Sequence, residues 1–179
     1  MITIVGLSVE HSERSCVTDN PHPRFSYAVR SDRSGVVVDS ARLAIGDWTC
    51  EVDDQTAVVY GGKPLRPFTE YRVTLDVNTT DGEHAHAETT FETGRLDQGW
   101  QGRWISDAGY DFVEKKVSPI PMMFRKTFIC DPTKSVRKAR LYATAMGVYD
   151  FACDGNRIGD RYFAPGFTSY KTNLQYQTY

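Results

Sequence analysis

The sequence predicts an all-β fold for three reasons: apolar and polar residues alternate with a period of two, turn residues separate the alternating segments, and helical periodicity is missing. The clearest alternation covers residues 71–77, where apolar side chains occupy every second position. Asp81-Gly82 separates it from a second alternating segment at residues 84–91, which is a strong hairpin signal because both residue types tolerate positive φ. Residues 111–117 are compatible with one or two helical turns and nothing longer.

The first part of the chain has the strand spacing of a β-sandwich. Residues 24–30 alternate in the same way as the two later segments, and Asn-Pro, Gly-Gly and Asp-Gly pairs mark turns between alternating segments. This spacing predicts an antiparallel sandwich of about seven short strands over the first ~90 residues.

A local motif precedes the clearest strand. Leu65, Pro67 and Tyr71 follow the order L-x-P-x-T-x-Y, which resembles the signature of fibronectin type III domains. In those domains the tyrosine hydroxyl bonds a backbone group upstream and holds the crossover between the sheets, the tyrosine corner. A core tyrosine that merely begins a strand is the alternative interpretation. Residues 1–95 are therefore predicted to form a fibronectin type III-like or immunoglobulin-like sandwich, without the Cys…Trp…Cys pattern of a disulfide-bonded immunoglobulin domain.

A domain boundary is predicted near residue 95, because Gly94, Gly99 and Gly102 lie there among polar residues. Strand patterns resume over residues 124–129 and 138–145. A third pattern ends at Asp154-Gly155-Asn156, which is another hairpin signal. Residues 96–179 are expected to form an incomplete second β domain.

Four stretches together resemble the N-terminal region of glycoside hydrolase family 78, the bacterial α-L-rhamnosidases. They are residues 91–94 (FETG), 100–105 (WQGRWI), 124–128 (FRKTF) and the long run 139–179. In the long run, the family has an N-G-x-x-V-G-D hairpin and a P-G-W-T-x-Y segment. This chain has Asp154, Ile158 and Phe167 where the family usually has Asn, Val and Trp, and these exchanges preserve turn chemistry and aromatic bulk.

The resemblance implies a fibronectin type III-like or immunoglobulin-like sandwich followed by a partial jelly-roll β-sandwich. It also implies that the chain is an accessory, itself inactive fragment of an enzyme that hydrolyses terminal α-L-rhamnose from glycosides with inversion. The catalytic (α/α)6-barrel lies outside this chain in that view, and the rest of the parent glycosidase is the expected partner. Two alternatives remain open: a free-standing carbohydrate-binding protein, and an adhesion or scaffolding module suggested by the first domain alone.

Inverting glycoside hydrolysis needs two carboxyl groups about 6.5–9.5 Å apart across a sugar-binding cleft. No sequence pattern fixes such a pair here, and solvated turn carboxylates are the favoured interpretation. The acidic residues considered are Asp107, Asp111, Glu114, Asp131, Asp150, Asp154 and Asp160.

Sugar binding by the second domain is the non-catalytic function considered, because a sugar ring needs aromatic faces and polar groups for its hydroxyls. Core or interdomain packing of most of these aromatic residues is the other interpretation. Some jelly-roll domains of the family bind sugars with the help of calcium, so calcium is the cofactor that the resemblance admits. The candidate residues are Asp154, Asn156, Asp160, Tyr162 and Tyr170, with Tyr149, Phe163 and Phe167 as further aromatic groups.

Other charged patterns are weaker. His84 and His86 fall on one face of a strand and would begin a metal site, but no third ligand has motif spacing, so an exposed strand face is favoured. Lys134, Arg137, Lys138 and Arg140 form a short basic run, which is interpreted as a solvated sheet edge. The net charge of -2 favours neither nucleic acid nor membrane as a partner.

The four cysteines are irregularly spaced and predict free thiols in a reducing compartment, so the cytoplasm is the expected location. Met1–Glu10 lacks the basic and apolar regions of a signal peptide. Self-association is expected, because an incomplete jelly roll exposes strand edges and apolar surface.

Overall fold

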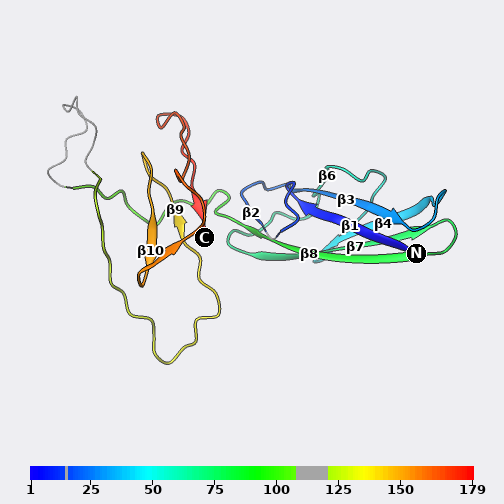
Figure 1. Ribbon diagram of the computed structural model, residues 1–179, viewed down its shortest axis with the longest axis horizontal. Helices are drawn as coiled ribbons and strands as arrows, with labels where there is room; N and C mark the ends of the chain where they lie inside the picture. The colour runs from blue at the N-terminus through cyan, green and yellow to red at the C-terminus, as the bar shows by residue number, and fades with distance from the viewer. Residues whose placement is uncertain (15, 108–120) are drawn as a thin grey trace. The chain divides into compact units, whose positions relative to one another are not determined.

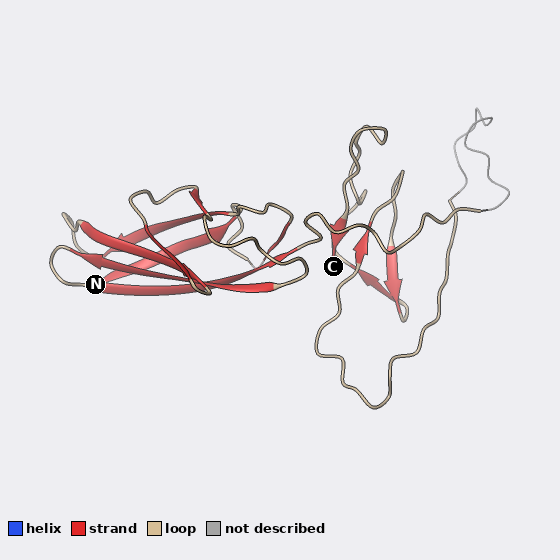
Figure 2. Ribbon diagram, turned by 180° about the vertical axis from the view of Figure 1, so that it is seen from behind, coloured by secondary structure: helices blue, strands red, loops and turns tan. Residues whose placement is uncertain are grey.

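The computed structural model describes residues 1–14, 16–107 and 121–179, and these residues form strands, turns and loops without a helix (Figure 2). The predicted all-β fold class is therefore confirmed. Residues 111–117, which are compatible with a helical turn, lie outside the described residues. The chain divides into two units, Met1–Gly99 and Trp100–Tyr179.

The first unit is a sandwich of two sheets, with strand orders β1-β3-β6 and β2-β8-β7-β4-β5 (Figure 1). Its strands are β1 (Ile2–Val9), β2 (Cys16–Thr18), β3 (Arg24–Ser31), β4 (Val38–Ile45), β5 (Trp48–Glu51), β6 (Val58–Val59), β7 (Glu70–Thr79) and β8 (His84–Thr93).

One pairing departs from the predicted antiparallel pattern: β2 pairs parallel with β8. A hairpin forces its two strands to run antiparallel, whereas strands separated by a long connection are free of that constraint. Most of the first unit lies between β2 and β8 in the sequence. The expectation of a purely antiparallel sandwich is therefore wrong at this edge.

The apolar face of β7 lies at the centre of the core. Val73, Leu75 and Val77 are fully buried, as the period-two alternation predicts. They lie opposite Thr89, Ala87 and Ala85 of β8. Sixteen buried residues form the core: Ile2, Leu7, Val9, Phe25, Tyr27, Ala41, Leu43, Ile45, Val52, Tyr60, Leu65, Val73, Leu75, Val77, Ala85 and Phe91.

The loop between β7 and β8 confirms the predicted hairpin and changes one detail. Gly82 has a φ of 84°, whereas Asp81 is not among the residues with positive φ. The carboxylate of Asp81 instead accepts a hydrogen bond from the Thr79 hydroxyl at 2.5 Å. Only the glycine therefore supplies the left-handed conformation in this turn.

In its described residues, the second unit has four short strands, which form two separate pairs. They are β9 (Tyr142–Ala143), β10 (Phe151–Cys153), β11 (Asn156–Ile158) and β12 (Gln177–Thr178). β10 pairs with β11, and β12 pairs with β9. The predicted hairpin turn is confirmed, since Asp154 and Gly155 have φ values of 49° and 81°, the left-handed pair that a type I′ turn needs.

Two strands predicted for the second unit are wrong: one does not form, and the other is much shorter than predicted. Residues 124–129 form no strand, and of residues 138–145 only Tyr142–Ala143 does. A strand exists only where a neighbouring segment accepts and donates its backbone hydrogen bonds. Residues 124–129 have no such neighbour within the described part of the chain.

Candidate functional site

The β10–β11 hairpin and the loop after it hold four of the five predicted sugar-binding residues. Asp154 and Asn156 flank the turn glycine, and both are exposed. The Asn156 amide donates to the backbone carbonyl of Asp154 at 3.3 Å, which holds the Asn156 side chain against the turn. Asp160 follows β11 and is also exposed.

Arg157 organises this region, although no sequence motif marks this residue. Its guanidinium donates to the Asp150 carboxylate at 2.9 Å and to the Arg161 carbonyl at 2.7 Å. The same group lies 4.8 Å from the centre of the Tyr162 ring, in a cation–π arrangement. The hydrogen bond that Arg157 donates to Asp150 raises the pKa of Arg157. Arg157 thus holds one candidate residue, Tyr162, beside the hairpin.

Two aromatic residues of the following loop are strongly exposed. Phe163 has a φ of 57°, which is a strained conformation for a bulky residue. Phe167 is 93% exposed and packs edge-on against Tyr170 at 6.0 Å between ring centres. The contacts of the described residues link Tyr170 to Phe167 and not to the hairpin. The structure therefore groups Asp154 with Asn156 and Tyr162 with Arg157, and places Tyr170 elsewhere.

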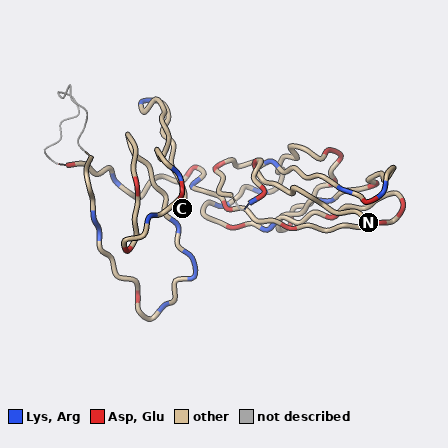
Figure 3. Tube along the Cα trace, viewed as in Figure 1, with Lys and Arg blue, Asp and Glu red and all other residues tan. Residues whose placement is uncertain are grey.

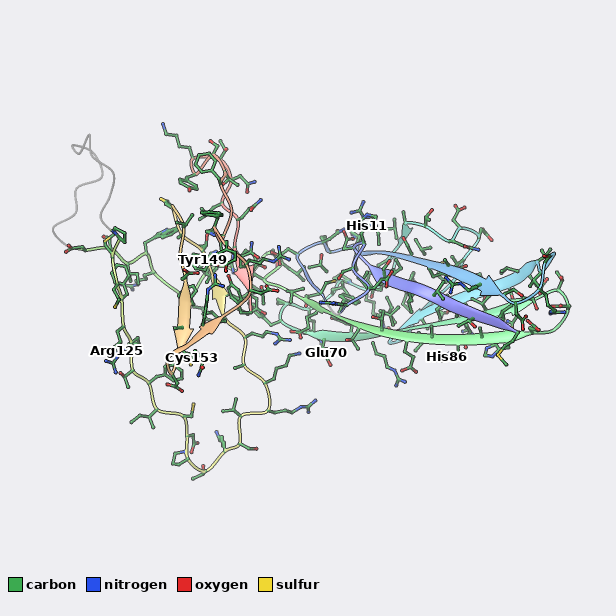
Figure 4. All side chains as sticks on the ribbon, viewed as in Figure 1. His11, Glu70, His86, Arg125, Tyr149 and Cys153 are labelled. Atoms are coloured by element: carbon green, nitrogen blue, oxygen red, sulfur yellow. The ribbon has the colours of Figure 1, made fainter. Side chains whose placement is uncertain are left out.

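Tyr149 is a packing residue. Its hydroxyl donates to the carbonyl of Ala143 at 3.2 Å and lies 3.4 Å from the hydroxyl of Tyr179. Burial raises the pKa of Tyr149, and its ring lies 4.7 Å from that of Phe151. Figure 4 shows Tyr149 among the short strands of the second unit. These contacts connect the two strand pairs.

Asp131, another candidate carboxylate, has local partners. Asp131 accepts hydrogen bonds from the backbone and hydroxyl of Thr133, and these bonds lower the pKa of Asp131. Lys134 of the basic run lies 3.6 Å from the same carboxylate. Asp107 is exposed, and Asp111 and Glu114 lie outside the described residues.

In the first unit, the histidine pair belongs to a ladder of charged and polar side chains across β7 and β8 (Figure 4 labels His86). Asp76 Oδ1 lies 3.2 Å from His84 Nε2 and 2.7 Å from His86 Nδ1. His86 Nε2 lies 3.1 Å from Glu88, which also accepts from Arg72 Nε at 2.9 Å. Asp76 of β7 and His86 of β8 lie directly opposite each other in the antiparallel pairing. A prediction of which β7 residue pairs with which β8 residue would therefore have identified this ladder.

The ladder fits charge pairing better than metal binding. The hydrogen bond to the Asp76 carboxylate is the largest influence that raises the pKa of His86, and the same bond lowers the pKa of Asp76. Within residues 1–14, 16–107 and 121–179, no three His, Cys, Asp or Glu side chains are arranged to hold a metal ion.

The predicted structural residues surround the crossover before β7. The Arg66 N–H donates to the Tyr71 hydroxyl at 2.8 Å, which is the hydrogen bond of a tyrosine corner. The ring of Tyr71 stacks on Phe91 at 5.3 Å. Leu65 is buried in the core, and the Pro67 carbonyl accepts from the Thr69 hydroxyl at 2.9 Å.

The cysteines are free thiols, as the spacing predicts. Cys16 and Cys50 are half-buried, whereas Cys130 and Cys153 are exposed. Burial raises the pKa of the Cys16 thiol. In the described part of the chain, no helix is long and apolar enough to cross a membrane.

The sheets and the tyrosine corner define the first unit as an immunoglobulin-like β-sandwich, followed by a second all-β unit. Residues 4–97 match the family described as "Rha78A-like, N-terminal immunoglobulin domain". Residues 134–179 match "Alpha-L-rhamnosidase N-terminal domain". The chain belongs to the α-L-rhamnosidase family and corresponds to its N-terminal region.

Known relatives agree with this assignment. An α-L-rhamnosidase from Streptomyces avermitilis is 30% identical over 156 residues, which are 84% of this chain and 14% of that protein. An α-L-rhamnosidase from Formosa agariphila is 34% identical over 127 residues, which are 67% of this chain and 14% of that protein. The chain thus spans 14% of the length of each of these relatives.

A solved structure shares the fold. The α-L-rhamnosidase from Dictyoglumus thermophilum superposes with a TM-score of 0.82 at 23% identity. The match covers 98% of this chain and 23% of that chain. The similarity supports the order of the strands along both units.

Proposed function

We propose that this chain is the accessory N-terminal region of an α-L-rhamnosidase. The whole enzyme would remove terminal α-L-rhamnose from glycosides with inversion, at an (α/α)6-barrel supplied by another part of the polypeptide. The observation that carries the proposal is the match of both units to N-terminal rhamnosidase domains, in a chain that spans 14% of its relatives.

The test compares the purified chain with the complete gene product on an aryl α-L-rhamnoside. We expect turnover by the complete protein and none by the chain, with the anomer of the first-formed sugar read by NMR. Turnover by the homogeneous chain would contradict the accessory role. Release of the retained anomer by the complete protein would contradict inversion.

Sugar binding by the second unit is the alternative, favoured by the exposure of Tyr162 (78%) next to the polar hairpin turn. Calcium takes six to eight oxygen ligands, and within the described residues no three His, Cys, Asp or Glu side chains converge to supply a carboxylate cluster for it. The measurement is a calorimetric titration of the chain with L-rhamnose, with and without calcium, using Tyr162→Ala as the matched variant. Binding that is lost in the variant would support this function, and the absence of heat would remove it.

A further inference from the structure

The chain passes from one sheet of the first unit to the other through a strained turn between β1 and β2. β1 belongs to the three-stranded sheet and β2 to the five-stranded sheet. Glu10 has a φ of 48° and His11, which Figure 4 labels, has a φ of 65°. The backbone groups of Val9 and Ser12 pair across this turn in both directions, at 3.0 and 2.9 Å. Two successive left-handed residues without a glycine persist only where their surroundings hold them.

The carboxylate of Glu10 holds this turn. Its Oε1 atom accepts from the Arg24 backbone N–H at 2.7 Å and from the Asn20 amide at 3.1 Å, and its Oε2 atom accepts from the Arg24 guanidinium at 2.8 Å. The Glu10 side chain is only 20% exposed, so these charge-assisted bonds are stronger than those of a surface ion pair. Acidic and basic residues are interspersed over the first unit in Figure 3, so this pair belongs to no patch of one sign. One carboxylate thus ties the turn to the residues before and at the start of β3.

The segment that this carboxylate closes makes little contact with the core. We call residues 10–14 and 16–20 the strap, and none of these residues is buried. Val9 before the strap and Pro23 after it are both fully buried, so the segment is anchored at its two ends. A segment with few buried apolar contacts opens at a lower free energy than the core strands of the same protein.

The strap covers the outer edge of β8. β2, the strand within the strap, pairs with the end of β8 from Phe91 to Thr93 and is the outermost strand of its sheet. The pairing continues at Gly94, whose N–H donates to the Thr18 carbonyl at 2.8 Å. An uncovered strand edge is a template for pairing with another chain. Whatever keeps the strap closed therefore also keeps this edge of β8 covered.

We propose that the strap opens and closes as a unit while the rest of the sandwich stays folded, and that the Glu10 carboxylate holds it closed over β8. The backbone strain at Glu10 and His11 favours opening. The hydrogen bonds from Arg24 and Asn20 to the carboxylate oppose it. This conformational device lies within the first unit and does not depend on the proposed function.

Cys16 of the strap reports opening in the full chain. Its thiol is half-buried and donates to the Val9 carbonyl at 3.5 Å, so an open strap exposes it. We expect iodoacetamide to alkylate Cys16 about 10-fold faster in Arg24→Ala, because the closed strap loses a charge-assisted hydrogen bond. Arg30→Ala, an exposed position on the same strand, is the matched control, and the exposed Cys130 gives the rate for an open thiol. Peptide mass spectrometry measures each cysteine separately, and equal Cys16 rates in the two variants would overturn the proposal.

The Arg24 variant also separates opening from a change in thiol chemistry. Burial and the negative charge of Glu10 raise the pKa of the Cys16 thiol, and the thiolate is the form that reacts. Arg24→Ala leaves the Glu10 charge without its cation, which keeps the thiol protonated and by itself slows alkylation. Faster alkylation in this variant therefore reports opening of the strap. Slower alkylation would overturn the proposal.

Two neighbouring amides distinguish local opening from unfolding of the whole sandwich. The Gly94 N–H donates to Thr18 of the strap, whereas the Thr93 N–H donates to the Thr69 carbonyl, outside the strap, at 2.9 Å. In hydrogen exchange followed by NMR, we expect Gly94 to exchange faster than Thr93 in the unmodified chain.

Glu10→Gln extends the same measurement, because it keeps the size of the side chain and removes its charge. We expect the exchange of Gly94 to rise about 10-fold in this variant and that of Thr93 to stay unchanged. Acceleration of both amides would mean that the sandwich opens as a whole, and an unchanged Gly94 would mean that the carboxylate does not hold the strap. Either result would overturn the proposal, as would equal exchange of the two amides in the unmodified chain.

Discussion

The two units of this chain use similar strand patterns and reach different degrees of organisation. The first unit has sixteen buried core residues, including Phe25, Leu75 and Phe91. The second unit buries only alanine and proline among its described residues and leaves Phe128 and Phe167 exposed. The difference teaches that period-two alternation specifies a face for burial, while burial itself requires a second layer.

The strongest test of this contrast removes one aromatic ring from each unit. Phe91→Ala should lower the free energy of unfolding of the first unit by about 3–5 kcal/mol, because the ring is buried against Phe25 and Tyr71. Phe128→Ala, in the second unit, should change the free energy of unfolding of this chain by less than about 0.5 kcal/mol, since the ring is exposed. Urea denaturation followed by circular dichroism measures both, and similar losses would break the comparison.

A second test removes one hydroxyl group. Tyr71→Phe should destabilise the first unit by about 1–2 kcal/mol, because the Arg66 N–H loses its acceptor at the crossover between the sheets. Tyr162→Phe is the matched control in the second unit, where the tyrosine is exposed. The measurement is again urea denaturation. A neutral Tyr71→Phe would show that the corner hydrogen bond is dispensable.

A smaller effect is expected at the two hairpin turns. Gly82→Ala should cost the first unit about 1 kcal/mol, because an alanine is strained at a φ of 84°. Gly155→Ala imposes the same strain at a φ of 81° but should leave the unfolding of the first unit unchanged. Thermal unfolding of both variants checks this difference. A loss in the first unit from Gly155→Ala would show that the two units unfold together.

The smallest effect concerns pH. Because Asp76 and Glu88 raise the pKa of His86, the folded protein binds this proton more tightly than the unfolded chain. The stabilisation is fully present below the ordinary histidine value of 6.5 and is lost as the pH rises through the raised pKa. Urea denaturation at about pH 5 and about pH 8 should show that the free energy of unfolding falls as the pH rises, and that it falls less in His86→Gln. An equal fall in the variant would exclude this ladder as the cause.

The sequence predicted the parts of the fold that depend on neighbouring residues. The buried face of β7 and the turns at Gly82 and Gly155 follow from alternation and from residues that tolerate positive φ. The strand at residues 124–129 was predicted by the same rule and is wrong, because the rule says nothing about a pairing partner. The candidate sugar-binding set was predicted by residue type alone, so neither the role of Arg157 nor the separation of Tyr170 could be foreseen.

The sequence by itself determined the all-β class, the inward face of the main strands and the position of the hairpin turns. These properties arise from side-chain chemistry and backbone preferences within a few residues. Only the tertiary structure decided the parallel pairing of β2 with β8 and the hydrogen bond between Tyr71 and Arg66. It also decided which alternating segments became strands, because a strand forms only where backbone groups from elsewhere in the protein complete its hydrogen bonds.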